Sequence, residues 1–177
     1  MLVVCTGNIC RSPMGEALLR AHLDARGTAV NVHSAGTMAW NAGPPNEAVA
    51  AMAEMGLDIS AHRSRQLTTE LIGEADLVLG MTRQHVDRIT ALAPDAATRV
   101  FLVEELVRLG GVVGARSEGE ALRAWLLRVH EARPHAQVRG RGEDEVGDPI
   151  GEPLDVYRAT AARLDASLRD LASLLTT

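Results

Sequence analysis

The chain has 177 residues, of which 46% are hydrophobic and 23% are charged, as is usual for one globular domain. Its net charge is −5, and its 18 basic residues are all arginines scattered along the sequence, which argues against nucleic acid as the main partner. No apolar run approaches the roughly 20 residues of a membrane span, and the N-terminus lacks the pattern of a secretory signal, so we expect a cytoplasmic protein without a membrane partner.

Short apolar runs rich in β-branched residues predict four β-strands. These runs are residues 2–4, 29–32, 75–79 and 99–103, and helical patterns lie between them. Parallel strands need crossover connections, which helices usually supply. The alternation therefore predicts a single α/β domain, residues 1–177, in which helices cover both faces of a parallel sheet.

Helix boundaries are marked by capping and stop residues. Ser12 and Pro13 predict an N-cap and first helical position, so the first helix spans about 13–26 and stops at Gly27. Further helices are expected over 46–55 and from Thr82 to Leu92. The last helix has one buried face with a period near 3.6, formed by Leu154, Tyr157, Ala161, Leu164, Leu168 and Leu171.

Residues 104–147 form an enlarged helix-loop segment. Gly110-Gly111 predicts a break in the chain, and Ser117 followed by Glu120 resembles a capping box that opens a helix containing Trp125. Residues 133–147 are polar and glycine-rich, which predicts a loop. We interpret the Trp125 helix as an additional core-packing element, with a lid or partner surface as the alternative.

A reactive motif lies between the first strand and the first helix, with the sequence Cys5-Thr6-Gly7-Asn8-Ile9-Cys10-Arg11-Ser12. This loop leaves the carboxyl end of a strand and brings backbone N–H groups to a helix N-terminus, where oxyanions bind. The helix dipole, the loop amides and Arg11 favour the Cys5 thiolate, which makes Cys5 a nucleophile. A buried pair of small residues after a strand is the alternative.

The other loop residues suit phosphate binding. Arg11 presents a planar fork to two phosphate oxygens. Gly7 permits close backbone approach, and Asn8 tolerates a left-handed conformation. Ser12 is placed to hydrogen-bond the Cys5 sulfur. The motif therefore predicts phosphoryl transfer through the thiol.

The loop, followed by Pro13-Met14, resembles the signature C-x-G-N-x-C-R-S-P of the low-molecular-weight protein tyrosine phosphatases in their bacterial branch. The resemblance implies a four-stranded parallel sheet and hydrolysis of protein phosphotyrosine through a phosphocysteine. It implies catalytic roles for Cys5, Arg11 and Asp148, the last as general acid in Asp148-Pro149. It also implies phosphate or substrate contacts from Thr6, Gly7, Asn8, Ile9, Cys10, Ser12 and Trp40, and support of Asn8 by Ser34 and by His62 of the H-x-x-R-x-L segment.

No cofactor and no metal are expected, and the expected partner is a phosphorylated protein. The remaining histidines lack ligand spacing and are interpreted as surface or packing residues: His22, His33, His85, His130 and His135. Cys10 either fills space behind the loop or forms a reversible disulfide with Cys5 after oxidation. The sequence does not indicate the oligomeric state.

Three other functions remain open. The resemblance includes protein-arginine phosphatases, whose acid loop carries glycine as at Gly151, but which have threonine where this chain has Ile9. An apolar Ile9 with Trp40 favours a phenyl ring, so phosphotyrosine is preferred. Arsenate reduction would need a relay of further cysteines, whereas only Cys5 and Cys10 are present. A non-catalytic phosphate-binding module is disfavoured because Cys5, Arg11 and Asp148 are all retained.

Overall fold

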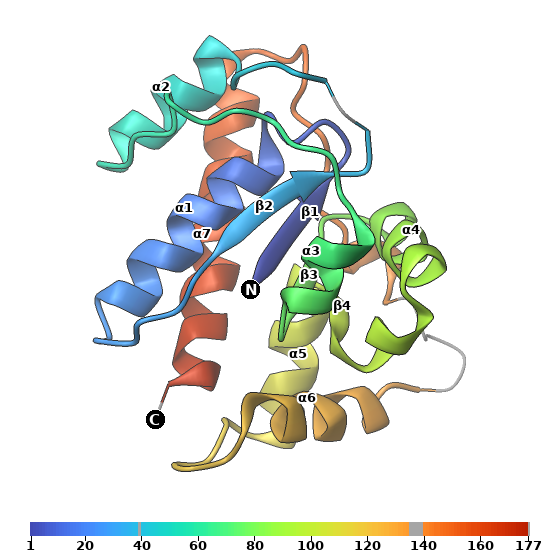
Figure 1. Ribbon diagram of the computed structural model, residues 1–177. Coiled ribbons are helices and arrows are strands. Elements are labelled where there is room, and N and C mark those ends of the chain that lie inside the picture. The colour runs from blue at the N-terminus through green and yellow to red at the C-terminus, as the bar shows by residue number, and fades with distance from the viewer. Residues whose placement is uncertain (39, 135–139, 177) are drawn as a thin grey trace.

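The computed structural model describes residues 1–38, 40–134 and 140–176. Its four strands, β1 (Leu2–Cys5), β2 (His33–Gly36), β3 (Val78–Gly80) and β4 (Val100–Leu102), form one parallel sheet in the order β2-β1-β3-β4 (Figure 1). This confirms the predicted α/β fold. Because all four strands run the same way, their carboxyl ends meet at one edge of the sheet, where ligands bind in such folds.

Helices cover both faces of the sheet, as predicted. The main hydrophobic cluster joins one face to α1, α2, α5, α6 and α7, and a second cluster joins the other face to α3 and α4. The helices are α1 (Arg11–Asp24), α2 (Asn46–Glu54), α3 (Thr69–Glu74), α4 (Arg83–Leu92), α5 (Val103–Val113), α6 (Leu122–Glu131) and α7 (Leu154–Leu175), with 3₁₀ turns at Pro94–Arg99 and Gly142–Asp144.

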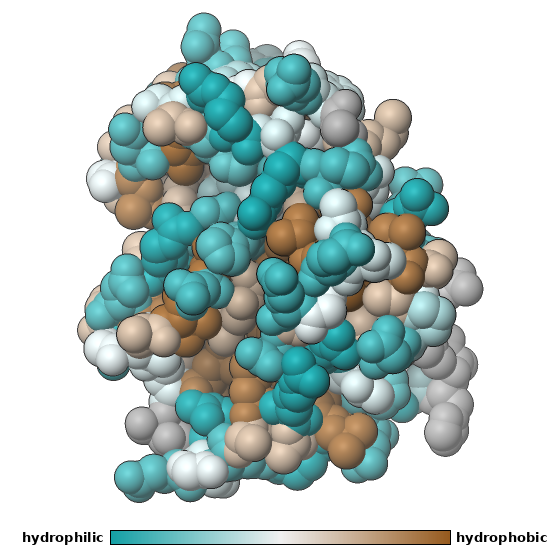
Figure 2. Space-filling view, in the orientation of Figure 1, coloured by the Kyte–Doolittle hydropathy of each residue, from teal (hydrophilic) through white to brown (hydrophobic). Residues whose placement is uncertain are grey.

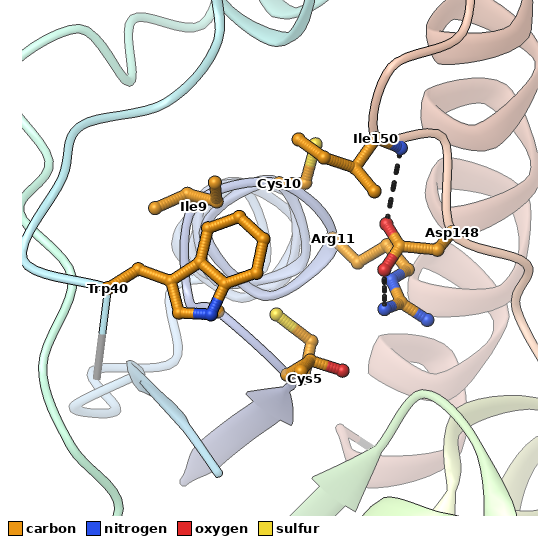
Figure 3. Close-up of a pocket in the computed structure, with 9 residues that line it drawn as sticks. Cys5, Ile9, Cys10, Arg11, Trp40, Asp148 and Ile150 are labelled. Carbon is orange, nitrogen blue, oxygen red and sulfur yellow. Dashed lines mark hydrogen bonds and ion pairs between the residues drawn. The ribbon is translucent and has the colours of Figure 1, made fainter. Parts of the chain in front are cut away.

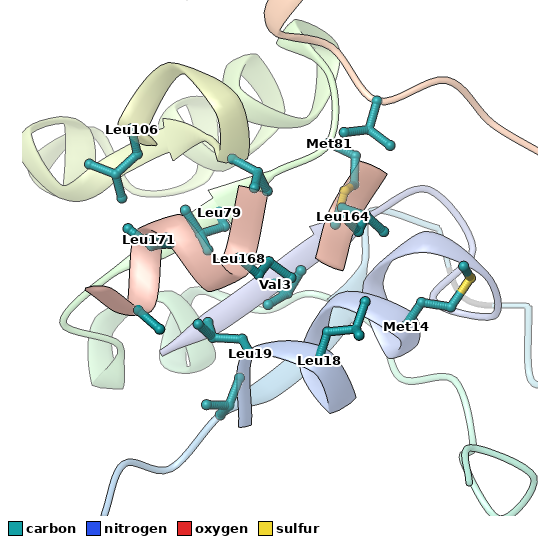
Figure 4. Packing of buried hydrophobic residues seen from close by; sticks show 14 of the residues in the cluster. Val3, Met14, Leu18, Leu19, Leu79, Met81, Leu106, Leu164, Leu168 and Leu171 are labelled. Atoms are coloured by element: carbon teal, nitrogen blue, oxygen red, sulfur yellow. The ribbon is translucent and has the colours of Figure 1, made fainter. Parts of the chain in front are cut away.

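The larger core is centred where α1 and α7 pack on the strands (Figure 4). Successive strand residues point to opposite faces, so Val3 and Leu79 enter this core whereas Val4 and Val78 enter the other. At Gly15 of α1, a Cβ atom would lie 3.1 Å from Cγ1 of Val3, so the glycine lets helix and strand approach closely. This packing fixes both ends of the loop between β1 and α1.

Three predicted boundaries were wrong. The third strand, expected at residues 75–79, is β3, Val78–Gly80. The strand expected at residues 29–32 is β2, His33–Gly36, because this is the segment whose register aligns with Leu2–Cys5 of β1. Sheet pairing thus overrides local β-propensity. The first helix begins at Arg11, so Ser12 lies in its first turn rather than at the N-cap, which is Cys10. The Ser12 side chain contacts the loop instead.

The predicted break at Gly110-Gly111 was also wrong, because both residues lie within α5. A Cβ atom at Gly110 would lie 2.9 Å from Cδ1 of Leu174 and 3.1 Å from Cζ2 of Trp125. Gly110 therefore allows two neighbouring helices to pack closely. Gly114, with φ at +92°, ends the helix.

The helix of residue Trp125 packs into the core, as predicted. Trp125 is fully buried in α6, and its Nε1–H donates to the carbonyl of Gly114 at 2.9 Å. Figure 1 shows α6 at the end of the molecule away from the loop after β1, which does not favour the lid alternative. The helix begins at Leu122, because Ser117 and Glu120 close a separate turn through two backbone N–H bonds.

The predicted loop at 133–147 is described only in part. Residues 135–139, including His135, lie outside the described residues, and Gly142–Asp144 forms a 3₁₀ turn. Among the helices that the structure describes, none is both long and apolar enough for a membrane span. On the face shown in Figure 2, hydrophobic residues are interspersed with hydrophilic ones.

Candidate active site

The loop that follows β1 is held by the segment that follows β2. Backbone N–H groups of Thr37 and Met38 donate to the carbonyls of Cys5 and Thr6, each at 2.9 Å. At Gly36, a Cβ atom would lie 2.6 Å from the Thr6 carbonyl oxygen, so only glycine fits beside the loop. The sheet edge thereby fixes the backbone on which Cys5 stands.

Asn8 organises the interior of the loop. It is fully buried, with φ at +53°, the left-handed conformation that its residue type tolerates. Its Nδ2 donates to Oγ of Ser12 at 2.9 Å and to Oγ of Ser34 at 2.8 Å. Its side-chain Oδ1 accepts from the backbone N–H of Arg65 at 2.9 Å. The backbone carbonyl of Asn8 accepts from Nε2 of His62 at 2.8 Å. Ser34 and His62 thus both contact Asn8.

Ser12 contacts the sulfur of Cys5, since its Oγ lies 2.9 Å from Sγ of that residue. Since Asn8 donates to this hydroxyl oxygen, the hydroxyl proton of Ser12 is left for the sulfur. A hydrogen bond donated to sulfur stabilises the thiolate form of a cysteine. Ser12 therefore links Asn8 to the sulfur of Cys5.

Arg11 is nearly buried and lies beside the cysteine. Its Nη1 donates to the carbonyl of Val146 at 3.1 Å, and its Nη2 forms an ion pair with Oδ2 of Asp148. Its Nε is buried without a hydrogen-bond partner among the described residues. Buried donors are almost always paired, so this N–H group suits the binding of an acceptor such as an oxyanion.

The loop after β1, together with Trp40 and Asp148, lines a pocket of about 100 Å³. Figure 3 shows the Cys5 sulfur facing a space with Trp40 on one side and Arg11 on the other. Trp40 packs on the loop, where a Cβ atom at Gly7 would lie 2.9 Å from its indole ring. The predicted site residues brought together in the lining are Cys5, Thr6, Gly7, Ile9, Cys10, Arg11, Trp40 and Asp148, and Ile150 completes it.

The segment before Asp148 is anchored to the rest of the fold. The backbone N–H of Val146 donates to the Met81 carbonyl at 2.8 Å. The Glu145 carboxylate accepts from the backbone N–H and Nε of Arg83, and Asp144 forms a bidentate ion pair with Arg108. These contacts connect the loop that carries Asp148 to α4 and α5.

Cys10 differs chemically from Cys5. Both are free thiols, but burial raises the pKa of the Cys10 thiol to about 12, with a hydrogen bond to Tyr157 opposing the shift. Cys10 is therefore a neutral thiol across the physiological range. Cys10 is buried, which agrees with a packing role, and it lines the same pocket as Cys5, which agrees with a redox role.

Two residues of the site were missed in the sequence. Glu16 accepts a hydrogen bond from Oγ of Ser34 at 2.6 Å, which extends the support of Asn8 to α1. His85, interpreted as a surface or packing residue, is buried and lies 3.0 Å from Oγ1 of Thr6. The spacing of Thr82 and His85, a capping box at the start of α4, was the available signal.

The other histidines fit the interpretation as surface or packing residues where they are described. His33 is exposed, and His22 pairs with Asp165 of α7. Within residues 1–38, 40–134 and 140–176, no cluster of three or more metal-ligating side chains is found.

Comparison with known proteins gives concordant results. The family model for low molecular weight phosphotyrosine protein phosphatase matches residues 1–111. A protein-arginine-phosphatase of Bacillus subtilis is 35% identical over 99% of this chain and 95% of its own length. A probable low molecular weight protein-tyrosine-phosphatase, EpsP of Ralstonia solanacearum, is 46% identical over 60% of this chain and 71% of its own.

A solved structure shows the same architecture. The low molecular weight protein tyrosine phosphatase from T. tengcongensis superposes with a TM-score of 0.73 and 33% identity, covering 98% of this chain and 97% of that one. The loop signature, the sheet and the matches over most of the chain agree. The chain belongs to the low molecular weight phosphotyrosine protein phosphatase family.

Proposed function

We propose that this enzyme hydrolyses phosphotyrosine on proteins through a phosphocysteine at Cys5. The observation that carries the proposal is the position of the Cys5 sulfur in a pocket that has the guanidinium of Arg11 on one side and the indole of Trp40 on the other. The first feature suits a phosphoryl group and the second suits a phenyl ring.

In the first step, the Cys5 thiolate attacks phosphorus and the bond to the tyrosyl oxygen breaks. Arg11 and the loop amides hold the phosphoryl oxygens, where charge must be stabilised during transfer. Asp148 donates its proton to the departing oxygen. Since Asp148 is paired with Arg11 in this structure, it must turn from the guanidinium to the leaving group when phosphate enters.

In the second step, the Asp148 carboxylate accepts a proton from water while the water oxygen attacks phosphorus. The sulfur–phosphorus bond breaks, which releases inorganic phosphate and restores the thiolate. Ser12 stabilises that thiolate through the contact at 2.9 Å. The loop therefore serves both steps without a cofactor.

Protein-arginine phosphatase activity is the second candidate. It is favoured by the Bacillus subtilis relative, which is named for that activity and aligns over nearly the whole chain. Against it stand the aliphatic side chains of the pocket, Ile9 and Ile150, which offer no hydrogen-bond acceptor to a guanidinium. Burying an unpaired polar group is costly, whereas a phenyl ring gains from the same walls.

The experiment compares kcat/KM for matched phosphotyrosine and phosphoarginine peptides on the wild type, Ile9→Thr and Ile9→Val. We expect the wild type to favour phosphotyrosine, Ile9→Thr to shift the ratio toward phosphoarginine, and the apolar control Ile9→Val to leave it unchanged. A wild type that prefers phosphoarginine would reverse the assignment. Cys5→Ser should abolish turnover of both peptides while retaining part of the phosphate affinity.

We also propose a cytoplasmic location and a phosphorylated protein as the partner. The mechanism needs Cys5 as a thiolate, and both cysteines of the described structure are free thiols. A reducing compartment preserves that state. Fractionation of cells that produce the protein, followed by immunodetection, tests the location.

A further inference from the structure

His85 contacts Thr6 of the pocket wall, and Thr82 at the start of α4 holds its ring in one orientation. It is 4% exposed, and its Nδ1 lies 3.0 Å from the backbone nitrogen of Thr82 and 2.9 Å from the hydroxyl of the same residue. A backbone N–H group can only donate, so Nδ1 must accept. The neutral imidazole therefore carries its proton on Nε2.

The ring is also kept neutral. Burial, reinforced by the positive charge of Arg11 and opposed by Glu145, lowers the pKa of His85 to about 4. A neutral ring with an unprotonated Nδ1 has one donor, the N–H group at Nε2. This donor lies 3.0 Å from Oγ1 of Thr6.

Thr6 follows the nucleophile and lines the pocket. A threonine hydroxyl has one proton, and accepting from His85 leaves that proton for a different acceptor. The β-branched side chain has few χ1 rotamers, so a bond to a fixed imidazole selects among them. His85 thus controls where the Thr6 hydroxyl points without itself lining the pocket.

We infer that His85 is a positioning residue, which holds the Thr6 hydroxyl so that its proton is presented to the phosphorylated substrate bound above Cys5. The inference rests on the proposed phosphatase function and deepens it. His85 acts through Thr6 and takes no part in bond making or breaking. The pair adds an oriented donor to a pocket wall that is otherwise largely apolar.

A double-mutant cycle tests the inference with a phosphotyrosine peptide. Thr6→Val removes the hydroxyl at nearly constant shape, and His85→Phe removes the donor while filling its space. Each change alone should lower kcat/KM roughly tenfold, as for a lost oriented hydrogen bond. Because both changes remove the same hydrogen bond between His85 and Thr6, kcat/KM of the double variant should be little lower than that of either single variant.

Conservative variants separate positioning from folding. Thr6→Ser retains a hydroxyl, and His85→Gln retains an N–H donor near the Nε2 position, so both should recover most of the activity. His22→Phe, a change of a histidine on α1 that contacts Asp165 of α7, is the matched control and should leave kcat/KM unchanged. Thermal unfolding of each variant shows whether a loss of activity follows a loss of fold.

Two results would overturn the inference. The first is an active wild type whose two single changes lower kcat/KM additively in the double variant, since His85 would then act independently of Thr6. The second is a ¹⁵N NMR spectrum that places the His85 proton on Nδ1. If the proposed function itself were wrong, the wild type would not hydrolyse the peptide, which is a distinguishable outcome.

Discussion

The guanidinium of Arg11 is paired with the carboxylate of Asp148 on the side of the pocket opposite Trp40. Arg11 is 3% exposed and Asp148 is 38% exposed, so the pair joins a buried cation to an accessible anion. In the proposed mechanism the first should bind phosphate and the second should face the leaving group. Substrate phosphate must therefore compete with Asp148 for Arg11.

This competition predicts tighter anion binding without Asp148. Asp148→Asn removes the negative charge, so vanadate affinity should rise roughly two- to fivefold, the value of a partly exposed ion pair. Isothermal titration calorimetry measures it, with Glu152→Gln as control because this exposed acid lies four residues away in the same loop. Equal gains in both variants would mean that general charge, rather than the pair with Arg11, limits binding.

Removal of the general acid should depend on the leaving group. Asp148→Ala should slow the first step by roughly 10²–10⁴-fold for alkyl or weakly acidic phenyl phosphates, and much less for para-nitrophenyl phosphate. A good leaving group departs without a proton. Single-turnover rates across a series of aryl phosphates give the dependence, and a uniform loss across the series would assign Asp148 a structural role.

Oxidation should be reversible through Cys5 and Cys10. Peroxide converts the reactive Cys5 thiolate to a sulfenic acid, which condenses with the neutral Cys10 thiol and releases water. Mass spectrometry after peroxide treatment should show an intramolecular disulfide, with activity restored by dithiothreitol. In Cys10→Ala the inactivation should become irreversible, and wild-type protein that yields only sulfinic or sulfonic Cys5 would contradict the prediction.

The two adjacent glycines of α5 should respond oppositely to alanine. Gly110→Ala forces a methyl group against Leu174 and Trp125 and should lower the free energy of unfolding by about 1–3 kcal/mol. Gly111 has nothing within 4 Å of its Cβ position, so Gly111→Ala should raise it by up to about 1 kcal/mol through helix propensity. Urea unfolding of both variants provides the comparison, and equal effects would refute the packing argument.

The buried His85 should make the fold sensitive to mild acid. Its pKa is about 4 in the folded protein against 6.5 as the ordinary value, so the unfolded chain binds its proton first as the pH falls. Stability should drop between pH 6.5 and 4 by on the order of 3 kcal/mol from this group. His85→Gln should remove that part of the decline in urea titrations, and parallel curves for the two proteins would exclude it.

The loop chemistry could be read from the sequence because it is local. Cys5, Asn8, Arg11 and Ser12 lie within eight consecutive residues, and a strand followed by a helix dictates where their backbone N–H groups point. The α/β class follows equally from hydrophobic runs that alternate with helical patterns. Both depend on short-range steric and hydrogen-bonding rules, which a single chain displays directly.

Tertiary structure decided the features that depend on residues far apart in the chain. Residues 33–36 pair with β1 because of register, although residues 29–32 are richer in β-branched side chains. Gly110 lies inside a helix, at a place where Trp125 and Leu174 pack so closely that they leave no room for a Cβ atom. His85 supports Thr6 across 79 positions, since parallel strands β1 and β3 bring their carboxyl ends to the same edge. Such contacts are set by packing in three dimensions, which local propensity does not encode.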